Sequence, residues 1–217
     1  MTRFVVHSIP GSPFGRAVLA VLHEKHAPCV FAPVAPQTLK SEAHLARHPF
    51  GRVPVLDDGD FRLYETAAIV RYLDRILPTP PLTPTDPKAA ARMDQTMNIS
   101  DWYLFQGVGN VIAFQRVVGP KILGLTPDEG AIAAAMPKAH QVFGELSRLL
   151  GDQAYFAGDE ASLADFMLGA QLDFFTETPE WALLTETRVN LSRWLARMNA
   201  RPSMAATTWA EVAALAA

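Results

Sequence analysis

The sequence predicts two domains of different character: an α/β domain over residues 1–77 and an all-helical domain over residues 88–217. In the first stretch, short apolar runs alternate with apolar residues at helical spacing, as in a mixed α/β fold. Residues 78–87 hold five prolines and no helical period, which is typical of a linker. Beyond it we find helical patterns and no convincing strand. With 217 residues, of which 49% are hydrophobic, the chain can bury a sizeable core.

The first elements form a βαβ unit. Residues 4–6 are a short apolar run that predicts a buried strand, and the Pro-Gly-Ser sequence at 10–12 ends it. Apolar residues at 18, 21 and 22 follow at helical spacing, and residues 29–31 predict a second strand. A strand, a helix and a strand within about thirty residues indicate parallel pairing and a right-handed crossover.

A hairpin and a helix complete the first domain. Residues 53–56 and 61–63 predict two strands, and the Asp-Asp-Gly-Asp sequence at 57–60 predicts the turn between them. A helix starts near Glu65, and its apolar face runs to Leu77. The predicted order is βαβ, a short helical stretch, and ββα.

Four helical patterns follow the linker, and they cover or begin at residues 88–118, 126–129, 162–165 and 190–199. The first is loosened by Gly107 and Gly109, and the second is expected to have its N-cap at Thr126. Ser162 and Asp165 have the spacing of a reciprocal cap. Losing one cap typically costs ~1 kcal/mol. We therefore expect Asp165 to matter for stability and not for chemistry.

Composition excludes several classes of function. Nineteen basic and twenty-two acidic residues leave a net charge of −3, which gives no electrostatic reason to expect nucleic acid or a membrane surface as partner. The single cysteine excludes an intramolecular disulfide, and six scattered histidines predict no metal site. The start of the chain does not read as a signal peptide, and no stretch approaches the ~18 apolar residues of a membrane helix. We expect a cytoplasmic protein.

Ser12 is the first candidate for chemistry, because it lies in the loop between a predicted strand and a predicted helix. A helix N-terminus carries unpaired N–H groups and a partial positive charge, so anions collect there. A hydroxyl at this position can donate a hydrogen bond to a thiolate. The alternative is that Ser12 is only an N-cap, with Pro13 filling the first helical position.

Two further pairs of residues flank predicted elements. Pro54 at the start of a strand either lies at an edge or follows a cis bond, and Val53 could then pair its backbone with a peptide-like ligand. Glu65 and Thr66 open the helix after the hairpin, where they could hold the amino and carboxylate groups of a ligand. The alternatives are an ordinary trans proline and normal helix-start chemistry.

The joint order of these segments resembles the glutathione transferase family from end to end. Residues 12–19 (SPFGRAVL) are similar to the motif of its serine-type classes, phi-like, theta-like or a related bacterial class. Residues 48–54 (HPFGRVP), 65–69 (ETAAI) and 162–165 (SLAD) match further family segments. The resemblance implies a thioredoxin-like N-terminal domain followed by an all-helical domain. We predict a cis bond between Val53 and Pro54 on this basis.

By the resemblance, glutathione is the co-substrate and Ser12 activates its thiol. The Val53 backbone, before Pro54, is expected to pair with the cysteinyl part, and Glu65 with Thr66 is expected to hold the γ-glutamyl end. Two further positions are less regular: Lys40 falls near the place of a basic residue for the glycyl carboxylate, and Arg52 stands where glutamine is commoner. Gly15 replaces a serine, alanine or threonine of many relatives.

A second pocket would take a small hydrophobic electrophile. Phe14, next to the serine, is a candidate wall, and Trp102 and Phe105 are further candidates, together with Tyr103 and Phe114. The alternative for at least half of the aromatic residues in the helical domain is a helix–helix core.

Two other residues are set aside. His7, at the end of the first strand, could act as a base but is more simply structural, and Cys29 reads as a small core residue. No cysteine stands in place of Ser12, which argues against the mixed-disulfide chemistry of the cysteine-type classes.

The sequence thus predicts a glutathione transferase for detoxification, and reduction of hydroperoxides is compatible with the same residues. The alternatives are a non-catalytic protein that binds glutathione or hydrophobic ligands, and a glutathione-dependent isomerase or dehalogenase. A homodimer is expected, because Phe50 lies in a turn where the family often has a residue that inserts into the partner subunit.

Overall fold

The computed structural model describes residues 4–216, which divide into two compact units. The first unit comprises Met1–Leu82 and Ala200–Ala217, and the second comprises Thr83–Asn199. The division falls inside the proline-rich stretch 78–87. Residues 200–217, which the sequence grouped with the helical domain, belong to the first unit.

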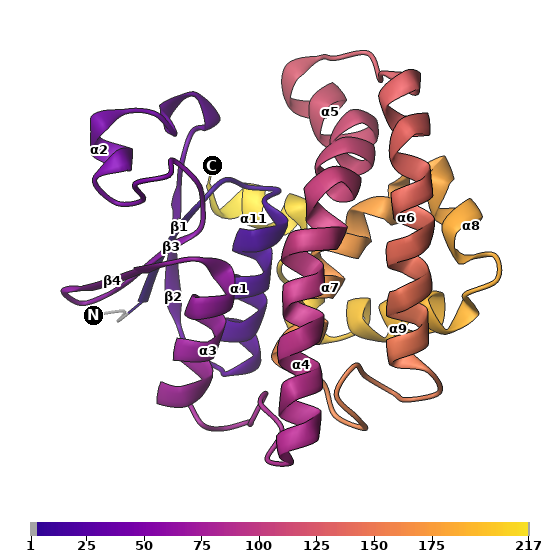
Figure 1. Cartoon of the computed structure of the whole chain (residues 1–217). Coiled ribbons are helices and arrows are strands. Elements are labelled where there is room, and N and C mark those ends of the chain that lie inside the picture. The colour runs from indigo at the N-terminus through magenta and orange to yellow at the C-terminus, as the bar shows by residue number, and fades with distance from the viewer. Residues whose placement is uncertain (1–3, 217) are drawn as a thin grey trace. The chain divides into compact units, whose positions relative to one another are not determined.

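The first unit contains a four-stranded mixed sheet (Figure 1). Its strands are β1 (Phe4–Ser8), β2 (Cys29–Pro33), β3 (Val55–Asp58) and β4 (Phe61–Tyr64), in the spatial order β2-β1-β3-β4. β1 pairs with β2 in parallel, and β3 pairs with both β1 and β4 in antiparallel fashion. The predicted βαβ unit and hairpin are therefore both present.

Helices α1 (Pro13–Glu24) and α3 (Thr66–Ile76) cover one face of this sheet (Figure 1). The middle of α1 buries an apolar face, in which Val18, Val21 and Leu22 are fully enclosed. Short helical turns η1 (Pro36–Thr38) and α2 (Glu42–Leu45) occupy the connection from β2 to β3.

The C-terminal segment adds two short helices to the first unit, α10 (Pro202–Ala205) and α11 (Trp209–Leu215). Glu24, in the last turn of α1, accepts hydrogen bonds from Arg201 and from Ser203 Oγ. Burial alone would raise the pKa of Glu24, but these two hydrogen bonds lower it. An ion pair and a hydrogen bond to α1 thus attach this segment to the first unit.

The second unit is helical, as predicted. It contains α4 (Pro87–Ile99), η2 (Ser100–Val118), α5 (Gly119–Leu123), α6 (Glu129–Leu150), α7 (Leu163–Leu172), η3 (Asp173–Glu177), α8 (Pro179–Thr185) and α9 (Val189–Asn199). Its strand-type pairing, within residues 83–199, is a bridge between Tyr155 and Gly158. Across the part of the chain that the structure describes, no helix is both long and apolar enough to cross a membrane.

The long helix expected over residues 88–118 is interrupted inside η2. Gln106 has an extended ψ of 106°, and Gly107 has a φ of +84°, which is costly for residues with a side chain. Lys138 donates a hydrogen bond to the Gln106 carbonyl, and the Gly107 N–H donates to Asn110 Oδ1 at 2.6 Å. Because these side chains replace the lost helical bonds, the break is a built feature of the helix.

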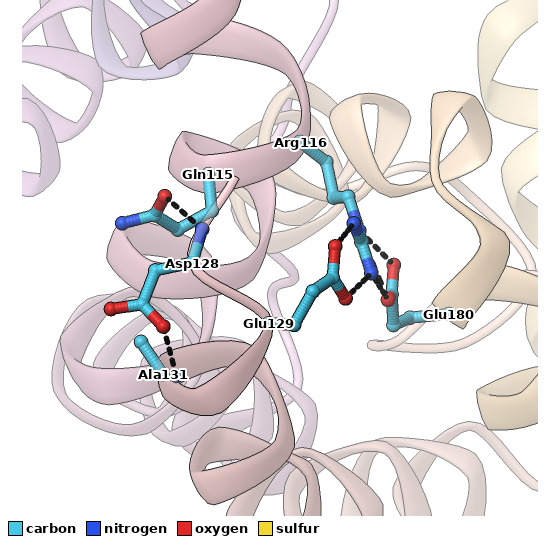
Figure 2. A network of polar contacts seen from close by, with 6 residues as sticks. All are labelled: Gln115, Arg116, Asp128, Glu129, Ala131 and Glu180. Atoms are coloured by element: carbon cyan, nitrogen blue, oxygen red, sulfur yellow. Dashed lines mark hydrogen bonds and ion pairs between the residues drawn. The ribbon is translucent and has the colours of Figure 1, made fainter. Parts of the chain in front are cut away.

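One arginine joins three helices of the second unit (Figure 2). Arg116 of η2 makes ion pairs with Glu129, at 2.6 Å from Nη1, and with Glu180, at 2.7 Å from Nη2. The hydrogen bonds that Arg116 donates to Glu129 and then to Glu180 raise the pKa of its guanidinium group. Both glutamates stand in the first turn of their helices, where a negative charge also favours the helix dipole.

The N-cap of α6 is Asp128, and the expected cap at Thr126 is wrong. Asp128 Oδ1 accepts from the Ala131 N–H at 2.9 Å, and the Asp128 N–H donates to Gln115 Oε1 at 3.0 Å (Figure 2). The side chain of Gln115, which the local sequence pattern does not include, therefore helps to decide where the helix begins.

The predicted reciprocal cap at the start of α7 is confirmed, and residues outside the motif also donate hydrogen bonds to Asp165. Asp165 Oδ2 accepts from the Ser162 N–H at 2.8 Å and from the Ser162 hydroxyl at 2.7 Å. Its other oxygen, Oδ1, accepts from Trp194 Nε1 at 2.8 Å and from the Phe156 N–H at 3.0 Å. Burial raises the pKa of Asp165, and the four donors oppose that shift.

Candidate active site

The strand register brings the candidate segments of the first unit together at one row of strand ends, which we call the site edge of the sheet. His7 pairs with Val55 across β1 and β3, and Val55 pairs with Tyr64 across β3 and β4. The end of β1, the start of β3 and the end of β4 therefore meet in one row. The loop with Ser12, the Val53–Pro54 segment and the start of α3 all leave the sheet at this edge.

Ser12 is the N-cap of α1. Its backbone is extended (φ −73°, ψ 120°), and its Oγ accepts from the Gly15 N–H at 3.3 Å. Pro13, the first helical residue, has no N–H to satisfy. Because the hydroxyl oxygen accepts the capping bond, its own proton remains for donation to another group. Both readings of the sequence are compatible: Ser12 caps the helix and still has a hydrogen-bond donor.

The peptide bond between Val53 and Pro54 is cis, as predicted. These residues precede β3 and lie outside its ladder, with Val53 half-buried and Pro54 buried. The carbonyl of the residue before them, Arg52, lies 2.9 Å from Nε2 of the buried His44. The Arg52 side chain is exposed to solvent.

Glu65 has a backbone that residues with side chains rarely adopt, with a φ of +74°. It is the N-cap residue of α3, yet its exposed carboxylate makes no capping hydrogen bond. Thr66, the next residue, is buried. A non-glycine residue held at positive φ costs of order 1–3 kcal/mol, and such residues concentrate at functional sites. The carboxylate is thus exposed to solvent at the start of a helix, on a backbone conformation that is unfavourable for a residue with a side chain.

Lys40 reaches the loop that precedes the cis proline. Its Nζ donates to the Phe50 carbonyl at 3.3 Å, and a Cβ added at Gly51 would lie 3.0 Å from that nitrogen. Ser8 of β1 pairs with Pro33 of β2, so the connection that carries Lys40 also leaves the sheet at the site edge. Lys40 is exposed, and its ammonium group is therefore accessible there.

His48 is a buried neighbour of the site whose environment the sequence did not indicate. Its ring lies 4.7 Å from the ring of Tyr64, centroid to centroid. Burial lowers the pKa of His48, and the charge of Glu65 partly opposes that shift. Burial thus favours the neutral imidazole, which packs against the ring of Tyr64 at the end of β4.

The aromatic candidates differ in exposure. Phe14 is half-buried in the first turn of α1. In the second unit Trp102 and Tyr103 are 69% and 58% exposed, while Phe105 and Phe114 are half-buried. The alternative of a helix–helix core suits Phe105 and Phe114, which are partly enclosed, and does not suit the exposed Trp102 and Tyr103. Contact of Trp102 and Phe105 with an electrophile stays a prediction.

His7 is occupied by a structural contact. Its Nε2 lies 2.9 Å from Asp57 Oδ2, and Arg62 binds the same carboxylate. Hydrogen bonds from Arg62 and then His7 hold the pKa of Asp57 below its ordinary value, against the effect of burial. Cys29 is half-buried rather than a core residue, and burial raises the pKa of its thiol, which disfavours the reactive thiolate. Within residues 4–216, no cluster of three or more His, Cys, Asp or Glu could hold a metal ion.

Gly15 is required by its neighbour Ser8. A Cβ added at Gly15 would lie 2.1 Å from Ser8 Oγ and 2.7 Å from Ser8 Cβ, and Ser8 is fully buried. Rotating the hydroxyl relieves the first contact but not the second. A side chain at position 15 therefore collides with Ser8.

We expect Gly15→Ala to destabilise the protein. Helix propensity favours alanine by about 1 kcal/mol, but overpacking typically costs about 1–3 kcal/mol and wins. Urea unfolding measures the difference, and Ser8→Gly in the same chain should recover part of the loss. Ser8→Gly alone is the matched control, because it carries the cost of glycine in a strand. A Gly15→Ala variant more stable than the wild type would contradict this packing.

The chain matches known families over both units. Residues 6–81 match the glutathione S-transferase N-terminal domain, and residues 110–202 match the glutathione S-transferase C-terminal domain. The glutathione S-transferase of Hyoscyamus muticus is 31% identical over 91% of this chain and 94% of its own length. Glutathione S-transferase F7 of Arabidopsis thaliana is 30% identical over 94% of this chain and 98% of its own.

A solved structure extends the likeness to the fold. Glutathione S-transferase I bound with the ligand lactoylglutathione is 27% identical and superimposes with a TM-score of 0.83, over 98% of this chain and 99% of that one. The predicted fold class, a thioredoxin-like α/β domain followed by an all-helical domain, is confirmed. Because the family match spans both units and the sequence relatives cover nearly the whole chain, this protein belongs to the glutathione S-transferase family.

Proposed function

We propose that this glutathione S-transferase is of the serine type and activates the thiol of glutathione at Ser12 for attack on small hydrophobic electrophiles. The geometry of Ser12 supports this proposal: its hydroxyl oxygen caps α1, while its hydroxyl proton stays available for a hydrogen bond to a ligand. A thiolate at this position receives that proton as a hydrogen bond and also meets the positive end of the helix dipole. The serine keeps its proton and is not the nucleophile.

The other candidate residues would hold the rest of glutathione. Val53 offers its backbone beside the cis Pro54, where the cysteinyl part can add as a short strand. Glu65, presented on a positive-φ backbone, suits the amino group of the γ-glutamyl end, and the start of α3 at Thr66 suits its carboxylate. Lys40, and with it Arg52, supplies positive charge for the glycyl carboxylate.

Turnover separates this enzyme from a binding protein. We expect conjugation of glutathione to an aryl halide, and we would assay reduction of cumene hydroperoxide beside it. A measurement of glutathione affinity is the control for an intact site. Glutathione binding without turnover of any member of an electrophile panel would favour the non-catalytic alternative. Turnover only of substrates that return glutathione unchanged would favour an isomerase.

We also propose a homodimer in which Phe50 contributes to the contact between subunits. Phe50 is 63% exposed, although it meets His48 and Tyr64 edge to face, with ring centroids 6.1 and 6.3 Å apart. Phe50→Ala should weaken the dimer measured by analytical sedimentation, because exposed aromatic side chains are frequent anchors of interfaces. Phe61→Ala removes another exposed aromatic residue and is the matched control. Unchanged dimer affinity in Phe50→Ala would show that Phe50 does not contribute to the contact between subunits and packs only within its own subunit.

A further inference from the structure

The loop that precedes Ser12 lies directly against the last helix of the chain. A Cβ added at Gly11 would lie 2.5 Å from Cε2, 2.6 Å from Cδ2 and 3.0 Å from Cε3 of Trp209. All three atoms belong to the six-membered ring of the indole, so the face of this ring covers the Gly11 Cα. Gly11 also has a φ of +84°, which favours glycine.

The segment that carries Trp209 is anchored along the length of α1. Arg201 and Ser203 bind Glu24 in its last turn, and Arg16 Nη2 donates to the Met204 carbonyl at 3.2 Å near its first turn. The segment thus runs from the end of α1 back to its start, where α11 lies (Figure 1). Trp209 is placed on the Gly11 loop by these contacts.

Glycine has more backbone freedom than any other residue, so the conformation at Gly11 depends on the contacts that restrict it. The loop has one internal turn, in which the Ser12 N–H donates to the Ile9 carbonyl at 2.9 Å. The indole lies against Gly11, which is part of the same turn and adjoins Ser12. A hydroxyl that activates a thiol must stay within about 0.5 Å of its productive position. The indole ring, which lies against this turn, can impose that restriction on the hydroxyl.

We propose that Trp209 is a positioning residue for the reaction: its indole fixes the Gly11 turn and thereby the direction in which the Ser12 hydroxyl donates. This role rests on the proposed function of Ser12. Removing the ring should leave the glutathione-binding segments at 53–54 and 65–66 in place. The expected loss is therefore in thiol activation and kcat, with the KM for glutathione changed much less.

The test compares Trp209→Ala, Trp209→Phe and Val212→Ala in the full-length protein. Val212 is buried in the same helix, so its truncation loosens α11 without removing the ring. We expect Trp209→Ala to raise the pKa of enzyme-bound glutathione by about one unit. Its kcat near pH 7 should fall about 10-fold, below the ~10²-fold that a misplacement of about 1 Å can cause. Trp209→Phe should retain most of the activity, and Val212→Ala should leave the thiol pKa unchanged.

A double variant tells whether Trp209 acts through Ser12. If it does, Ser12→Ala combined with Trp209→Ala will have the thiol pKa and the kcat of Ser12→Ala alone, because the two changes remove one interaction. Additive losses in the double variant, an unchanged thiol pKa in Trp209→Ala, or an equal shift in Val212→Ala would each overturn the positioning role while Ser12→Ala still shows its own loss. An unchanged thiol pKa in Ser12→Ala would instead overturn the proposed function itself, and the positioning role with it.

Discussion

Ser12→Ala is expected to lower conjugation turnover near pH 7 by about 10- to 150-fold, the range implied by losing one hydrogen bond to a charged group. Glutathione affinity should stay within a few-fold of the wild type, because the binding segments at 53–54 and 65–66 are untouched. Part of the lost turnover should return at alkaline pH, where the thiol ionises unaided. The pH profile of turnover, recorded for both proteins, measures all of this.

The magnitude follows from the energy needed to ionise a thiol. A free thiol has a pKa of about 8.5, and lowering it by about two units requires roughly 2.7 kcal/mol of selective stabilisation of the anion. A helix N-terminus supplies ~0.3–1 kcal/mol, and up to about 2 when partly buried. A hydrogen bond to a charged acceptor adds about 1.5–3 kcal/mol. The two contributions together suffice, and neither is comfortably enough alone.

Two neighbours serve as controls for this variant. Ser8 is fully buried, and within the described residues its hydroxyl has no hydrogen-bond partner, so Ser8→Ala should leave thiol activation unchanged. His7→Ala breaks the contact with Asp57 and should affect stability more than turnover. If Ser12→Ala were fully active and one of these controls inactive, the thiol would be activated from the end of β1 and not from the start of α1.

Asp165→Ala is expected to destabilise the protein by about 3–5 kcal/mol, well above the ~1 kcal/mol of a lost cap. Asp165 is fully buried and accepts four hydrogen bonds, two from Ser162 and one each from Trp194 and Phe156. Each buried donor left without a partner costs about 1–3 kcal/mol. Trp194 is itself fully buried, so water does not readily replace the carboxylate.

Urea unfolding measures this loss, and activity of the folded fraction is the second readout. Ser162→Ala is the matched control, because it removes the hydroxyl and leaves the other three donors to Asp165 in place, for an expected loss of ~1 kcal/mol. Turnover per folded molecule should be unchanged in both variants. An Asp165→Ala protein that unfolds like the wild type yet has lost turnover would place this residue in the site and not in the scaffold.

Features of the fold that depend on local pattern were predictable from the sequence. The βαβ unit, the Asp-Gly hairpin and the cap at Ser162 each rest on residues that are close in the chain, and the structure contains all three. The attachment of residues 200–216 to the first unit was not predictable. It depends on Arg201 meeting Glu24, residues 177 positions apart, and its helices are too short for a helical period.

The same distinction applies to the site. The position of Ser12 between β1 and α1 follows from local pattern, whereas the position of Lys40 beside the Phe50 carbonyl needs the β2–β1 pairing. No sequence signal connects Gly11 with Trp209, because each is unremarkable in its own segment. The positive φ of Glu65 could not be predicted either, since an acidic residue at a helix start normally has ordinary dihedral angles.

The central claim is that Ser12 stabilises the glutathione thiolate, and the pKa of the enzyme-bound thiol tests it most directly. The ultraviolet absorption of the thiolate, titrated against pH with glutathione saturating, gives this value for the wild type and for Ser12→Ala. We predict a wild-type value about two units below the ~8.5 of a free thiol, and a rise of about one to two units in the variant. A wild-type value near that of the free thiol, or the same value in both proteins, would contradict the claim.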